Sequence, residues 1–162
     1  METTKKAIVK SVLDSWHARI KEADNLLDNL TDEQLQKEIS PNKNRGIYLL
    51  GHLTAVHDKM LPLLNFEDQQ YTNLDDTFLA KPDKAVSEMP SAKDLRAYWK
   101  STNSKLATHF NNVQTDDWFL KHNSVSNEDF AKEPHRNRLT VVLGRTGHLA
   151  YHLGQLALLK NK

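Results

Sequence analysis

Two histidines four residues apart, His148 and His152, are the side chains in this 162-residue sequence whose spacing points most directly to chemistry. A helix turns by about 100° per residue, so side chains four positions apart differ in direction by only about 40°. Two imidazoles placed in this way can bind the same ion, and imidazole suits zinc, nickel, copper or iron. On the inward side of an apolar helix, two unpaired imidazoles would leave buried nitrogens without partners, which is costly. We therefore predict that this pair binds a divalent transition metal.

A third ligand is needed, because a catalytic zinc usually takes three protein ligands and keeps one position open. His52 lies midway along a predicted helix, as the pair does along another, so all three share one level if these helices are antiparallel neighbours. His57 is the alternative, and it points about 140° away from His52, so both are not expected to bind one ion. Periodicity leaves both open, since both border the apolar stripe. Gly51 and Gly147 each precede a candidate ligand and would let the two helices approach closely.

Several familiar kinds of site lack the residues that they need. Cysteine is absent, which excludes disulfides, thiolate zinc sites and a cysteine nucleophile. Leu149 stands where a zinc-protease helix needs glutamate. Di-iron bundles need Glu-x-x-His on two helices, and the chain offers only a lone weak relative, Asp14-x-x-His17. Neither a glycine-rich phosphate loop nor a Gly-x-Ser-x-Gly elbow occurs. The remaining histidines have no partner at ligand spacing and are interpreted as surface or boundary residues: His17, His109, His122 and His135.

The elements that position the histidines are predicted to be four long amphipathic helices. Apolar residues recur at three- and four-residue spacing in four segments, a pattern typical of helices with one buried face. The segments are residues 8–30, a second from Asn42 or Asn44 to Leu64 that Pro62 should end or kink, a third opening at Ser91, and a fourth from Leu139 or Thr140 almost to the end. No pattern predicts a sheet. The sequence therefore predicts one all-α domain over residues 1–162, a four-helix bundle with long crossover connections.

The connections between these helices decide which of them are neighbours. Thr31 opens a capping box and a short helical turn between the first two helices. Residues 65–90 are irregular and long enough to cross the bundle from end to end, which allows the second and fourth helices to lie side by side. Residues 111–138 are also irregular, with room for a short hairpin.

Charge and hydropathy narrow the classes of partner. Lys and Arg total 22 against 21 Asp and Glu, a formal net charge of +1, whereas a nucleic-acid binder normally shows a basic excess or stripe. No apolar run approaches the roughly 20 residues that span a bilayer. The first residues lack the apolar core of a signal peptide. We therefore expect a cytoplasmic protein with no nucleic-acid or membrane partner.

The sequence resembles a known family, the DinB/YfiT-like metal-dependent bundle proteins, over nearly the whole chain, and two segments carry the resemblance most clearly. Residues 48–57 read Tyr-Leu-Leu-Gly-His-Leu-Thr-Ala-Val-His, and residues 147–156 read Gly-His-Leu-Ala-Tyr-His-Leu-Gly-Gln-Leu. The family's last helix commonly has a basic residue after its second histidine. Leu153 stands there in this chain, so the ligands are kept and a substrate contact from that position is not expected.

The resemblance implies a fold, a metal site and a class of reaction. It implies a four-helix bundle, often a homodimer, with a zinc or nickel ion held by His52, His148 and His152 and with open positions for water or a thiol. Characterised relatives resemble thiol-dependent transferases, isomerases and hydrolases that use low-molecular-weight thiols such as bacillithiol or mycothiol. The implied function is activation of a thiol or water toward a small electrophilic substrate.

Three residues near the ligands are candidates for a catalytic role: Tyr48, Arg145 and Gln155. A cation at Arg145 suits a substrate carboxylate. The competing hypothesis is a non-catalytic binding or structural module in which the metal only pins two helices, and such a closed site needs a fourth protein ligand. A direct role in DNA repair is suggested by the family name alone, and the near-neutral charge argues against it.

Overall fold

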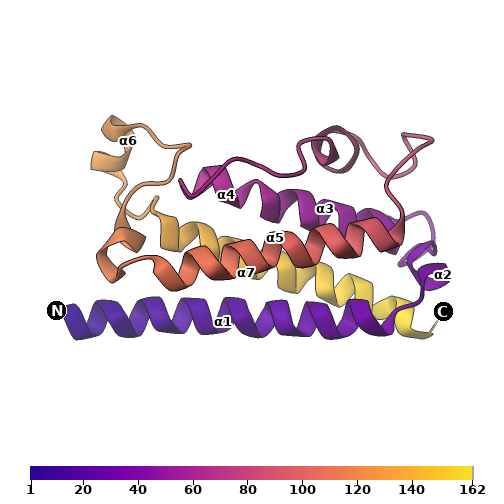
Figure 1. The fold of residues 1–162 in the computed structure, drawn as a ribbon, viewed down its shortest axis with the longest axis horizontal. Helices are drawn as coiled ribbons and strands as arrows, with labels where there is room; N and C mark the ends of the chain where they lie inside the picture. Colours follow the sequence, from indigo (N-terminus) through magenta and orange to yellow (C-terminus); the bar gives the residue numbers. More distant parts are fainter. Residues whose placement is uncertain (162) are drawn as a thin grey trace.

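Four long helices lie side by side in the computed structural model, which describes residues 1–161 (Figure 1). The bundle consists of α1 (Glu2–Asn29), α3 (Gly46–Asp58) with its short continuation α4 (Met60–Leu63), α5 (Ala92–Asn112) and α7 (Arg138–Ala157), which ends in the single turn η3 (Leu158–Asn161). No β-strand forms within residues 1–161, where the β-pairing is limited to two isolated bridges. The predicted all-α four-helix bundle is confirmed.

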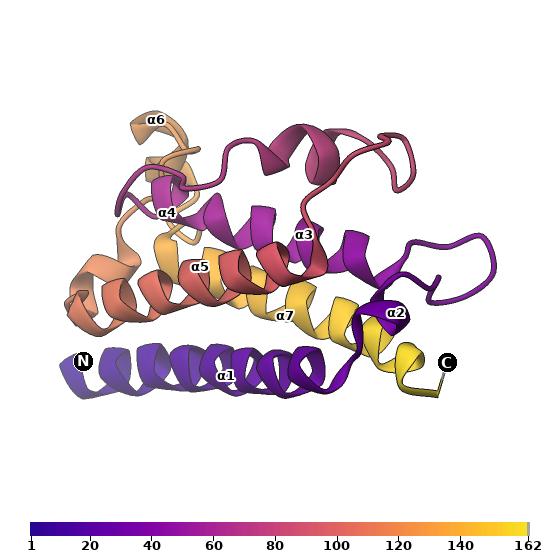
Figure 2. The same cartoon turned by 45° about the vertical axis from the view of Figure 1, so that its right-hand side comes forward.

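The helix directions bring the predicted partners together. In both views α1 and α7 run one way along the bundle, and α3 and α5 run the other way (Figures 1 and 2). Helix α7 packs against α1 on one side and against α3 on the other, while α3 also packs against α5. The second and fourth long helices, α3 and α7, are therefore antiparallel neighbours, as the positions of their histidines required.

Helix α3 is the central helix of the bundle. Of its 13 residues, all except His52 are buried. The helix is apolar on nearly every side because α5, α7 and the chain that follows α4 all cover it. A helix with such a surface needs a buried environment, and its one partly exposed residue is a candidate metal ligand.

The crossing connection, residues 64–91, returns along the outside of α3 from the end of α4 to the start of α5 (Figure 2). It contains one π-helical turn, η1 (Asp76–Ala80), whose Phe78 side chain is fully buried. Several hydrogen bonds tie the connection to α3 and to its N-cap residue, Arg45. The Tyr48 hydroxyl donates to the carbonyl of Lys81 at 2.7 Å, and Asp83 accepts from the backbone and guanidinium of Arg45, each at 2.7 Å.

The helix boundaries follow local chemistry that the sequence reveals in part. Helix α3 begins at Gly46, later than predicted, because the preceding turn holds Asn42 at φ 61° and is closed by the bridge between Glu38 and Arg45. The second helix breaks after Asp58, as expected from Pro62, which has no amide to donate to the carbonyl four residues before it.

Helix caps and the second irregular segment give a mixed outcome. Both hydrogen bonds of the predicted capping box at Thr31 are present and start α2 (Asp32–Leu35). The Ser91 side chain caps α5. The short hairpin for which the sequence left room between the third and fourth long helices does not form. That segment instead holds the 3₁₀ turn η2 (Thr115–Phe119) and α6 (Asn127–Lys132), with one isolated bridge between Lys121 and Asn137.

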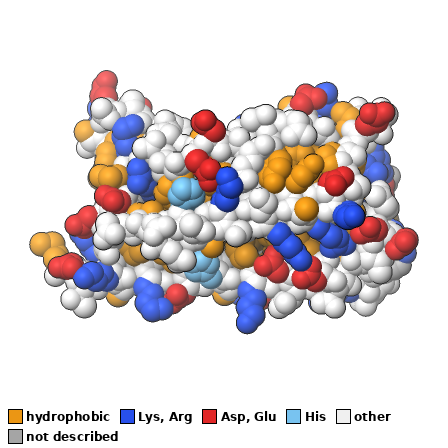
Figure 3. Space-filling model, viewed as in Figure 1, with side chains coloured by type: hydrophobic (Ala, Val, Ile, Leu, Met, Phe, Trp, Pro, Cys, Tyr) orange, Lys and Arg blue, Asp and Glu red, His pale blue; other side chains and the backbone are white. Residues whose placement is uncertain are grey.

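The surface carries mixed charges rather than one dominant sign. On the face drawn in Figure 3, basic and acidic side chains are interspersed, as expected for a formal net charge of +1. Within residues 1–161, no helix combines the length and the apolar character that crossing a membrane requires.

Candidate metal centre

His52 of α3 and His148 and His152 of α7 form one group, the three-histidine cluster, where the two helices pass each other. The Nε2 atom of His148 lies 3.2 Å from Nε2 of His52 and 3.1 Å from Nε2 of His152. One ligand atom from each ring lies within 4.8 Å of the other two. The rings meet edge to face, so three nitrogens from two helices face one small volume.

Hydrogen bonds on the far side of two rings fix where their protons are. Nδ1 of His52 lies 2.9 Å from the carbonyl oxygen of Phe78, which can only accept, so Nδ1–H donates to it. Nδ1 of His152 donates to Oε1 of Gln155 at 2.7 Å, and the amide nitrogen of Gln155 donates to the Tyr151 hydroxyl at 3.2 Å. In both rings Nε2 is left with a lone pair that points into the cluster. This arrangement is typical of metal-binding histidines, whose second nitrogen is oriented by an outer partner.

The third ring makes the cluster fit a cation. Nε2 of His148 faces two lone pairs and has at most one proton to donate, so the protein alone leaves one nitrogen unsatisfied. Nδ1 of His148 is buried and has no hydrogen-bond partner within residues 1–161. If all three Nε2 atoms carry lone pairs, one metal ion among them could accept all three. The single proton available on Nε2 of His148 could satisfy only one of the other two nitrogens.

The electrostatics of the cluster favour the neutral rings that a metal needs. Burial, and to a smaller extent the nearby charges of His152, His52 and Arg145, together lower the pKa of His148 to about 4. Burial also lowers the pKa of His152, against the opposing effect of its bond to Gln155. Near pH 7 both imidazoles are neutral, and neutral imidazole is the form that coordinates a metal.

His57, the alternative third ligand, lies in the core and outside the cluster. Its side chain is fully buried, with Nδ1 2.8 Å from Oδ1 of Asn103. Its ring lies between two tryptophans, 4.8 Å from Trp16 and 4.9 Å from Trp99 between ring centroids. The structure therefore brings His52, and not His57, to the pair on α7.

Acid should destabilise the fold through His57. Burial lowers its pKa from 6.5 to about 3, so between these values the unfolded chain binds a proton that the folded chain does not. The free energy of unfolding should therefore be unaffected by this group above pH 6.5 and fall below it, by up to about 1.4 kcal/mol per pH unit. We expect urea titrations to give a shallower decline with acid for His57→Gln than for the wild type. The exposed His17→Gln serves as the control, and equal slopes for all three proteins would contradict the prediction.

The three candidate catalytic residues occupy different positions. The Tyr48 ring stacks near His52, with centroids 6.4 Å apart, while its hydroxyl is engaged by the crossing connection. Gln155 is bonded to His152. Tyr48 and Gln155 therefore each adjoin one candidate ligand. Arg145 is partly buried and near enough for its charge to lower the pKa of His148.

Phe78 is a candidate functional residue that the sequence does not reveal. Its carbonyl holds His52, and its ring fills the space beside Gly51, where an added Cβ would lie 2.3 Å from a ring carbon. Gly51 thus admits the crossing connection rather than helix α7. An added Cβ at Gly147 would have no neighbouring atom within 4 Å. The expected close approach of two helices therefore does not explain why this position is a glycine. No motif or periodicity marks Phe78, because its contact is with a segment of irregular sequence.

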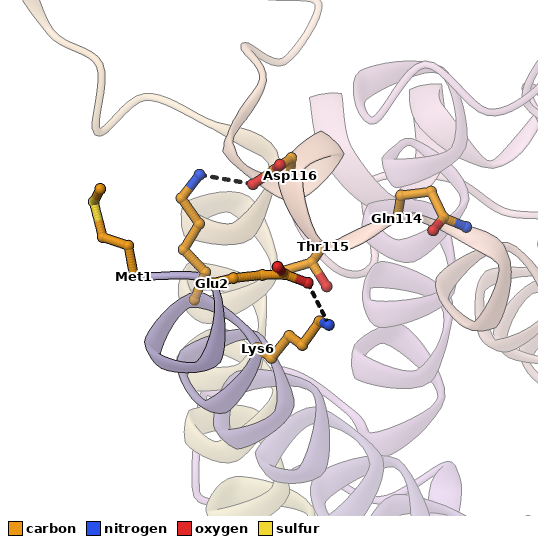
Figure 4. A pocket seen from close by; sticks show the side chains of 7 residues that line it. Met1, Glu2, Lys6, Gln114, Thr115 and Asp116 are labelled. Atoms are coloured by element: carbon orange, nitrogen blue, oxygen red, sulfur yellow. Dashed lines mark hydrogen bonds and ion pairs between the residues drawn. The ribbon is translucent and has the colours of Figure 1, made fainter.

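A separate cavity of about 390 Å³ lies at the N-terminal end of α1, against η2 (Figure 4). It is lined by charges that already pair, Lys5 with Asp116 at 2.7 Å and Lys6 with Glu2 at 2.5 Å. None of the three histidines lines it, so it is not part of the candidate metal centre.

Fold and cluster together define a helical-bundle protein with three histidines gathered between two antiparallel helices. The family model of the DinB superfamily matches residues 15–156, and the chain belongs to this superfamily, which confirms the resemblance. No curated protein matches the chain. Among solved structures, a conserved protein from Enterococcus faecalis matches with a TM-score of 0.54 and 12% sequence identity, over 94% of this chain and 97% of that one. At this identity the likeness concerns the fold alone.

Proposed function

We propose that the protein is a metal-dependent enzyme in which the three-histidine cluster binds one divalent transition metal. A metal held by His52, His148 and His152 would activate a thiol for transfer to a small electrophilic substrate, or water for the hydrolysis of that substrate. The observation that carries the proposal is the convergence of three Nε2 atoms, two of which have fixed lone pairs. Imidazole ligands suit zinc and nickel, the two metals that we favour.

The number of donors supports an open, catalytic site over a closed, structural one. A closed zinc site takes four protein ligands, whereas a catalytic site keeps an exchangeable position. Within residues 1–161 no further His, Cys, Asp or Glu joins the cluster. All three histidines are also partly exposed, so a small molecule can reach the position that the protein leaves free.

The residues around the cluster have separable tasks in this proposal. A divalent ion held by neutral imidazoles supplies Lewis-acid chemistry, lowering the pKa of a bound thiol or water toward neutrality. The carbonyl of Phe78 and the amide of Gln155 hold two rings in the tautomer that presents Nε2. Burial keeps His148 unprotonated at neutral pH. The thiol, the electrophile and the homodimer are parts of the proposal that rest on the family resemblance.

Cobalt substitution tests whether the site is open. We expect cobalt-loaded protein to gain a thiolate-to-cobalt charge-transfer band when 2-mercaptoethanol is added, because an exchangeable position accepts the thiol. His148→Ala should lose both the cobalt spectrum and the response. A cobalt spectrum that is unchanged by thiol and by pH would instead indicate a closed structural site and contradict the proposal.

A further inference from the structure

A cation without a counter-ion lies one helical turn from the three-histidine cluster. Arg145 precedes His148 by three residues on α7 and is partly buried. Within residues 1–161 it has neither a hydrogen bond nor an ion pair, although the other Lys and Arg side chains form thirteen ion pairs there. Burial lowers the pKa of its guanidinium, and no acidic neighbour opposes the shift. A partly desolvated charge without a partner is costly, so this position suits an incoming anion.

Arg145 lines a surface cleft of about 500 Å³, called here the Arg145 cleft. Its polar lining also includes Lys59, Gln69, Asn123 and Ser124. Lys59 is already neutralised by Asp75 at 2.7 Å, and Asp75 also accepts from Gln69 at 3.2 Å. The cleft therefore holds one unpaired positive charge, which matches a singly charged anion better than a doubly charged phosphate.

The Arg145 cleft continues the same seam between α3 and α7 that holds the histidines. Lys59, the residue directly after α3, follows His52 by seven residues, which is about two turns and returns to the same face. On α7, Arg145 precedes His152 by the same interval. Because the helices are antiparallel, both steps run in the same direction along the bundle. At 1.5 Å per residue, the cleft begins roughly 5–10 Å along the seam from the cluster.

We propose that Arg145 binds the carboxylate of a small substrate whose reactive group lies at the three-histidine cluster. This inference rests on the proposed function and adds the substrate class, a carboxylate-bearing molecule. A guanidinium presents two parallel N–H groups that match the two oxygens of a carboxylate, which gives orientation as well as affinity. Bound in this way, the substrate is held at its far end while its other end points along the seam to the metal centre.

The test compares charged and neutral thiols on the cobalt-loaded protein. The probes are 6-mercaptohexanoate and 6-mercaptohexanol, with binding followed by the thiolate-to-cobalt band. We expect the carboxylate to improve affinity by roughly 10-fold or more in the wild type. Arg145→Gln should remove this preference while keeping its cobalt, and Arg145→Lys should keep part of it. Arg136→Gln is the matched control and should behave as the wild type, because the partly exposed side chain of Arg136 pairs with Glu133.

The outcomes separate this inference from the proposed function. An undiminished preference for the carboxylate in Arg145→Gln would overturn the role of Arg145. If neither thiol binds cobalt, the proposed function fails. The carboxylate site at Arg145 is then tested with hexanoate, which has no thiol. A hexanoate-dependent shift of the Arg145 side-chain NMR signal supports the inference, and no shift overturns it.

The source of the carboxylate is distinguished by chain length. If shorter and longer mercaptoalkanoates no longer bind better than the matching neutral thiols, the thiol and the carboxylate belong to one molecule. If hexanoate binds as well in the presence of bound mercaptohexanol as in its absence, the carboxylate belongs to the second substrate.

Discussion

Replacing His148 and His152 together with alanine is expected to reduce the metal content from about one transition-metal ion per chain to background. The change removes two of the three converging Nε2 atoms and leaves His52 as the only ligand in the cluster. A single imidazole cannot retain a divalent ion against a chelator, because metal affinity is the sum of several ligand bonds. The measurement is elemental analysis of purified protein after metal loading and dialysis against a mild chelator.

The control for this prediction carries the same chemical change at positions outside the cluster. His17 and His135 are both exposed, and their double alanine variant should keep the full metal content. Circular dichroism of both variants checks that the helices remain. If the His148/His152 variant keeps its metal, the three-histidine cluster is not the metal site.

The second large effect is expected from a single methyl group at Gly51. An added Cβ would lie 2.3 Å from the Phe78 ring, so the crossing connection must move away from α3. Overpacking of this kind typically costs about 1–3 kcal/mol. Displacing Phe78 also moves the carbonyl that holds His52, and loss of such an outer partner typically weakens metal binding by about 10–100-fold. Gly51→Ala should therefore lower both the free energy of unfolding and the metal affinity.

Gly147→Ala is the matched control, since it makes the same change immediately before another cluster histidine. Nothing lies within 4 Å of its added Cβ, and the residue is exposed on α7. Replacing an exposed helical glycine with alanine should raise stability by about 1 kcal/mol and leave metal affinity unchanged. Chemical denaturation and competition with a chromophoric chelator measure the two quantities. Effects of the same sign for both variants would contradict the assigned role of Phe78.

The sequence was most informative where local chemistry decides the structure. The long helices follow from apolar periodicity, and the caps at Thr31 and Ser91 follow from side chains that bond to nearby amides. The spacing of His148 and His152 placed both on one face of α7. These features depend on residues close together in the chain, so they can be predicted without knowledge of the tertiary fold.

The apolar periodicity of the sequence does not decide between His52 and His57. Helix α3 is covered on nearly every side, so its residues show no narrow apolar stripe that would tell the two apart. The decision comes from tertiary contacts, with two tryptophans beside His57 and the Phe78 carbonyl beside His52. For the same reason the π-helical turn at Phe78 was not predicted.

A crystal structure with the metal identified by anomalous scattering tests the central claim most directly. We expect one anomalous peak per chain bonded to the Nε2 atoms of His52, His148 and His152, at about 2.0–2.1 Å if the metal is zinc. The remaining coordination position should be filled by a water molecule or another small ligand. A metal-loaded crystal with no peak among these three atoms, or with the peak at His57, would contradict the account.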